Sequence, residues 1–63
     1  MSELFPPSLA EMIACIEREI RFRVQVYPRR VAEGKMRQAK AEREIETMRA
    51  ILQRLCEARS KSA

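Results

Sequence analysis

Histidine, glycine and cysteine are scarce in this chain of 63 residues, which has no histidine, one glycine and two cysteines. Cys15 and Cys56 are 41 residues apart and form no CxxC pair, so they lack the close spacing of a structural zinc site. Two cysteines are also too few for a secreted disulfide scaffold. We expect no metal, no cofactor and reduced thiols that are buried as packing residues.

Long apolar runs are also missing. No stretch approaches the roughly 18 uninterrupted apolar residues of a membrane span. The first residues, MSELFPPSLAEM, lack the basic region and apolar run of a signal peptide. The sequence therefore predicts a cytoplasmic protein without a membrane partner.

Signatures of catalysis are absent as well. The GK pair at positions 34 and 35 lacks the upstream glycine and the strand of a phosphate-binding loop. Most carboxylates stand at helical spacing from a base, as Glu17 does from Arg21, which is typical of solvated ion pairs. We expect neither an enzyme nor a small-molecule substrate.

The residues that are abundant indicate amphipathic helices, because charged side chains make up 35% of the chain and alternate with apolar ones. In PPSLAE, Ser8 and Glu11 form a capping-box pattern, so a helix should begin at about Leu9 after an extended segment 1–8. Pro28 disfavours helical geometry at Tyr27, where this helix, 9–27, should end or kink.

A second helix is predicted at 36–58, followed by a frayed tail at 59–63. Gly34 suits the left-handed position of the intervening turn. Apolar residues recur at spacings of three and four in both helices. In an antiparallel hairpin, the numbers of residues that face each other have a constant sum. The sum is 68 for Tyr27 with Ala41 and also for Ile20 with Met48.

We therefore predict an all-α, antiparallel two-helix hairpin of one domain, 9–58, with coiled-coil-like packing. A hairpin this small leaves apolar flanks in water, so we expect a homodimer that forms a four-helix bundle. The side chains assigned to the core or the dimer contact are Ile13, Ile16, Ile20, Ile45, Met48, Leu52 and Leu55. Phe22 lies off the hairpin seam, and dimer contact and partner contact remain alternatives for it.

Positive charge is concentrated at the turn. Residues 21–43 contain eight bases and two acids, a charge of +6, while the whole chain carries +4. This region could be a soluble turn, bind phosphates or dock on an acidic protein surface. The residues expected to bind a partner are Phe22, Tyr27, Arg29, Arg30, Lys35 and Arg37.

At MIACIEREI, VYPRRVAEGKM and KAEREIETMRAIL the chain resembles a family of very small proteins from phage and prophage genomes of proteobacteria. In that family an arginine-rich helix runs into a Tyr-Pro-Arg turn, a Gly-basic-Met step and an alanine-rich second helix. The likeness covers residues 11 to 55. The chain departs from it at Arg37, where members often have Ser or Thr, which are good helix caps.

The chain is more loosely similar to the small dimeric helical anti-activators with which phages inhibit host regulators, including a quorum-sensing anti-activator that also contacts a pilus assembly ATPase. The resemblance implies a non-enzymatic protein in the host bacterial cytoplasm that binds a host protein such as a transcriptional regulator. The alternatives are a small basic nucleic-acid-binding dimer and a structural assembly component.

Overall fold

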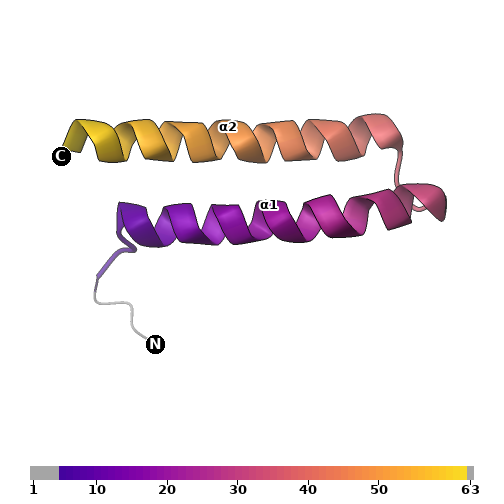
Figure 1. Ribbon diagram of the computed structural model, residues 1–63, viewed down its shortest axis with the longest axis horizontal. Helices are drawn as coiled ribbons and strands as arrows, with labels where there is room; N and C mark the ends of the chain where they lie inside the picture. The colour runs from indigo at the N-terminus through magenta and orange to yellow at the C-terminus, as the bar shows by residue number, and fades with distance from the viewer. Residues whose placement is uncertain (1–4, 63) are drawn as a thin grey trace.

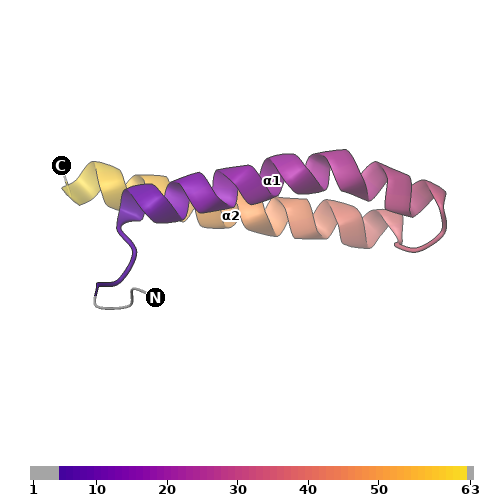
Figure 2. The ribbon, with the colours of Figure 1, turned by 90° about the horizontal axis from the view of Figure 1, so that it is seen from below.

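The computed structural model describes residues 5–62 as two helices, α1 (Leu9–Ala32) and α2 (Gln38–Ser62). The helices lie side by side and run in opposite directions, joined by a short turn (Figures 1 and 2). The described residues form no strand. The predicted all-α hairpin is confirmed at this level; of the predicted extended segment 1–8, residues 1–4 lie outside the described part of the chain, as does Ala63 of the tail.

The first helix begins where the capping box predicts. The Glu11 amide donates a hydrogen bond to Ser8 Oγ at 3.1 Å, and the Ser8 amide donates to Glu11 Oε1 at 2.8 Å. Ser8 itself is extended, with φ −77° and ψ 166°. Two of the free amide donors at the start of α1 are thus satisfied by side chains.

The end of α1 differs from the prediction, since the helix continues through Pro28 to Ala32 instead of ending at Tyr27. Proline cannot donate to the carbonyl of Val24, so this continuation has a local cost. Tyr27 and Val31 are both half-buried and line one groove with Ala41 of α2. Packing against α2 therefore holds the last turn of α1 in place despite the proline.

Gly34 reverses the chain in the left-handed conformation predicted for it, with φ 76°. The Lys35 amide donates to the Arg30 carbonyl at 2.9 Å, and the Gly34 amide donates to the Val31 carbonyl at 3.0 Å. This pair of bonds is a Schellman motif, which satisfies carbonyls that the helix end leaves free.

The second helix begins at Gln38, two residues later than predicted, and ends at Ser62, four residues later. The predicted frayed tail is thus helical through Ser62. Arg59 and Lys61 occupy the last turn, where positive side chains interact favourably with the negative end of the helix dipole. At the other end, the Ala41 amide donates to the Arg37 carbonyl at 3.0 Å, so Arg37 stands in the capping position.

The core is small because two helices form only one layer. The molecule measures 14 Å along its shortest axis, little more than the diameter of a single helix, roughly 10–12 Å. Among the described residues, Ile13, Ile20 and Ala41 are the buried apolar ones. The other predicted core residues are half-buried: Ile16, Ile45, Met48, Leu52 and Leu55.

Candidate interaction surfaces

The four predicted cations at the turn, Arg29, Arg30, Lys35 and Arg37, are all exposed, and we call them the basic tip. The Lys35 ammonium lies 3.6 Å from the Glu33 carboxylate. The three arginines have no ion-pair partner within residues 5–62. Their charge therefore remains available to an anionic group on another molecule.

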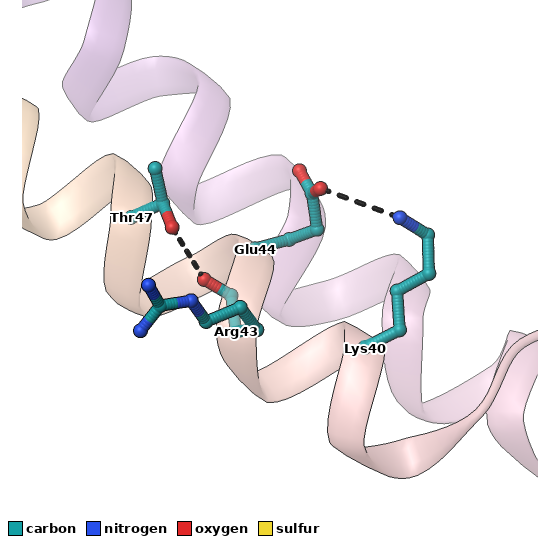
Figure 3. A network of polar contacts seen from close by, with 4 residues as sticks. All are labelled: Lys40, Arg43, Glu44 and Thr47. Carbon is teal, nitrogen blue, oxygen red and sulfur yellow. Dashed lines mark hydrogen bonds and ion pairs between the residues drawn. The ribbon is translucent and has the colours of Figure 1, made fainter.

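Three members of the basic tip surround one shallow hollow. Arg30, Lys35 and Arg37 line it together with Lys40. The Lys40 ammonium, however, pairs with Glu44 Oε2 at 3.5 Å on the exposed side of α2, next to the bond from Thr47 Oγ1 to the Arg43 carbonyl at 2.8 Å (Figure 3). The hollow thus contains two unpaired arginines, and Arg29 lies outside it.

Tyr27, also predicted as a contact residue, is half-buried between the helices. It lines a mainly apolar groove that we call the turn groove: Val24, Tyr27, Pro28, Val31, Gln38, Ala41, Glu42 and Ile45. Its ring closes the packed layer next to the turn. The structure therefore does not place Tyr27 in the hollow with the arginines.

Phe22 is exposed, with 56% of its surface accessible to solvent. It precedes Arg29 by seven residues, which is two turns of helix, so both side chains leave α1 on nearly the same side. Arg23, next to Phe22, donates a hydrogen bond to the Glu19 carboxylate, and this bond raises the pKa of the Arg23 guanidinium. The Arg23 guanidinium therefore stays charged across the physiological pH range.

An apolar groove that the sequence did not reveal lies at the end of the hairpin opposite the turn. We call it the terminal groove, and its lining is Pro7, Glu11, Met12, Cys15, Ile16, Ile51 and Leu55. Cys15 is exposed here, which contradicts the expectation that both cysteines are buried; Cys56 is half-buried. The reason is that Cys15 follows the buried Ile13 by two residues, about 200° around α1, and therefore lies off the packed seam.

The two grooves lie on opposite flanks of the seam. On α1, Met12 of the terminal groove and Val24 of the turn groove are twelve residues apart, and on α2, Ile45 of the turn groove and Ile51 of the terminal groove are six apart. At about 100° per residue, the two side chains on each helix are separated by about 120° around its axis. Met12, Cys15 and Ile51 belong to the apolar flanks that helical periodicity predicts beside the seam. Their closure into one groove depends on how α1 and α2 face each other.

Within residues 5–62, no group of three or more potential ligands could hold a metal ion, and neither helix is long and apolar enough to cross a membrane. The arrangement offers cationic and apolar contact surfaces. Comparison with protein-family models, curated proteins and solved structures found no significant match to this chain.

Proposed function

We propose that this chain is a non-enzymatic module of phage or prophage type that binds another protein and modulates it, a host transcriptional regulator being the partner class that the resemblance implies. The binding site is the basic tip, and the surface of the partner is acidic. The observation that carries the proposal is the group of three exposed arginines, Arg29, Arg30 and Arg37, that lack a carboxylate partner among the described residues.

Arginine suits this role because its planar guanidinium binds carboxylates through two parallel hydrogen bonds. Arginine is also among the residues that contribute most to binding energy at protein interfaces. The turn that carries the arginines is held by two backbone hydrogen bonds of 2.9 and 3.0 Å. Little conformational entropy should therefore be lost in the backbone when a partner binds.

The direct test is affinity capture from bacterial lysate with the native chain and with Arg30→Glu/Arg37→Glu. The charge reversal should reduce recovery of the partner at least tenfold, because like charges would then face each other. Arg49→Glu/Arg54→Glu is the matched control, because it changes the net charge by the same amount and both arginines are exposed on α2 away from the turn. Equal losses in both variants would show that net charge matters, not the basic tip.

Tyr27→Ala distinguishes binding by the basic tip from binding by the turn groove. If the arginines carry recognition, this variant should recover the partner nearly as well as the native chain, provided that circular dichroism shows the hairpin intact. A loss with Tyr27→Ala and none with the double arginine variant would move the site to the turn groove.

A second candidate function is binding of nucleic acid by the same cations, favoured by the +6 charge of residues 21–43. Such binding should weaken steeply with salt, because neutralised phosphates release counterions. Fluorescence anisotropy with a mixed-sequence duplex at two salt concentrations measures this. No binding at low salt would eliminate this function.

A further inference from the structure

The terminal groove and Phe22 leave a large apolar surface exposed on one flank of α1. A folded chain of 7.4 kDa is expected to expose about 4,200 Å², and this one exposes 5334 Å². The excess of about 1,100 Å² is spread over the whole chain, and it exceeds the roughly 800 Å² that each partner buries in a standard interface. Two more helices laid against this flank would cover the surface that the single layer leaves open.

From this surface we propose that two copies of the chain pair through α1 in antiparallel orientation, with Phe22 of each copy inserted into the terminal groove of the other. The occupant of the groove is thus a second copy of this chain. The inference concerns a surface centred on Glu19 and Phe22, distinct from the hollow that Arg30, Lys35 and Arg37 line, and does not depend on the proposed function.

Helical geometry places the ring and the groove on one face. Phe22 follows Cys15, a lining residue of the groove, by seven residues. Seven residues are two turns, so the two side chains leave α1 along the same line about 10 Å apart. Met12, Cys15, Glu19, Phe22 and Val26 recur at spacings of three and four, which is a second heptad stripe beside the one that faces α2.

A two-fold axis near Glu19 lets both copies make the same contact at the same time. It sets Met12 of one copy opposite Val26 of the other, and brings Phe22 level with Cys15 and Ile16 of the groove. Each chain then contributes one ring and receives one, as an isologous interface requires. The half-buried Glu19–Arg23 ion pairs lie near the axis, where a polar group within an apolar stripe can fix the register.

Charge selects the antiparallel orientation. Residues 9–20 of α1 contain three acids and one base, whereas residues 21–32 contain four bases and no acid. Antiparallel pairing puts the negative half of each α1 beside the positive half of the other. Parallel pairing would set four bases against four bases, which is repulsive.

Disulfide trapping tests the orientation. In a background of Cys15→Ser and Cys56→Ser, chains with Met12→Cys and chains with Val26→Cys are prepared separately, mixed and oxidised with copper phenanthroline. The mixture should yield mainly the crossed dimer between positions 12 and 26, identified by mass spectrometry. A product in which position 26 is joined to position 26 would overturn the antiparallel arrangement.

Sedimentation equilibrium tests the contact. The native chain should be a dimer at micromolar concentration, and Phe22→Ala should weaken its association at least tenfold. Val24→Ala is the matched control, because Val24 is exposed on the opposite flank (42% accessible) and should leave association unchanged. A folded native monomer, or dissociation by Val24→Ala and not by Phe22→Ala, would refute the proposal.

Discussion

Gly34 is the residue whose conformation the hairpin depends on most directly. Its φ of 76° is unfavourable for residues with a Cβ, and the space around the position is open, since an added Cβ would meet no atom within 4 Å. Any cost of substitution is therefore a backbone cost.

Gly34→Ala should lower the free energy of unfolding by about 1 kcal/mol, the usual penalty of the left-handed conformation. Urea denaturation followed by circular dichroism measures the change. Gly34→Asn is the informative companion, because asparagine tolerates this conformation better and should lose less. An equal loss for both variants would point to a cause other than the backbone.

Arg37 is an unfavourable residue for the position it occupies. It precedes the first residue of α2 and accepts the first helical hydrogen bond through its carbonyl, but its side chain cannot accept a bond from the free amides of the first turn. Its charge also lies at the positive end of the helix dipole, and the first turn contains no acid.

Arg37→Ser should therefore stabilise the hairpin by about 1 kcal/mol. Arg37→Ala, which removes the charge without supplying a cap, should give a smaller gain, and thermal unfolding of the two variants separates the contributions. If the proposed function is right, both variants also lose affinity for the partner. Arg37 would then lower the stability of the hairpin and raise its affinity for the partner.

At the scale of the element, α1 contains a proline in its interior, and packing against α2 compensates for the cost of that proline. Pro28 lies within the helix, where a proline costs about 3 kcal/mol relative to alanine. The helix nevertheless continues for another four residues, and Val31 in that last turn is half-buried against α2. The figure of about 3 kcal/mol is thus an upper limit on what removing the proline can recover.

Pro28→Ala should stabilise the hairpin by about 1–3 kcal/mol, because the Val24 carbonyl regains its amide donor. Urea denaturation gives the magnitude. Ala32→Pro is a contrasting variant at the end of the same helix and should destabilise it. A Pro28→Ala variant no more stable than the native chain would mean that the proline is needed to shape the turn.

Pro28 also shows which features of the fold could be predicted from the sequence and which could not. The start of α1 and the conformation of Gly34 follow from local signals, a capping box and a lone glycine, and both predictions are confirmed. The passage of α1 through Pro28 could not be predicted, because the penalty of the proline is local and the compensating contacts of Val31 come from α2. The terminal groove was missed for the same reason, since Met12 and Ile51 meet only in the folded chain.

For the whole molecule, the small core makes stability inseparable from association. Ile13, Ile20 and Ala41 are the buried apolar side chains among the described residues, which is little for a chain that must order two helices of 24 and 25 residues. If the copies pair as proposed, folding and dimerisation are linked by mass action.

The midpoint of thermal unfolding should accordingly rise with protein concentration. Calorimetry over a hundredfold range of concentration checks this, with Phe22→Ala measured alongside, for which the dependence should be much weaker. A midpoint that stays constant for the native chain would contradict the linkage.

The antiparallel course of the two helices also sets an order for folding. Tyr27 and Ala41, which share the turn groove, are 14 residues apart, whereas Ile16 and Leu55, which share the terminal groove, are 39 apart. Closing the longer loop costs about 1 kcal/mol more in chain entropy. The hairpin should therefore begin to fold beside Gly34, and contacts toward the open end should form later. Substitutions at the turn should then slow folding, and those at the open end should mainly speed unfolding.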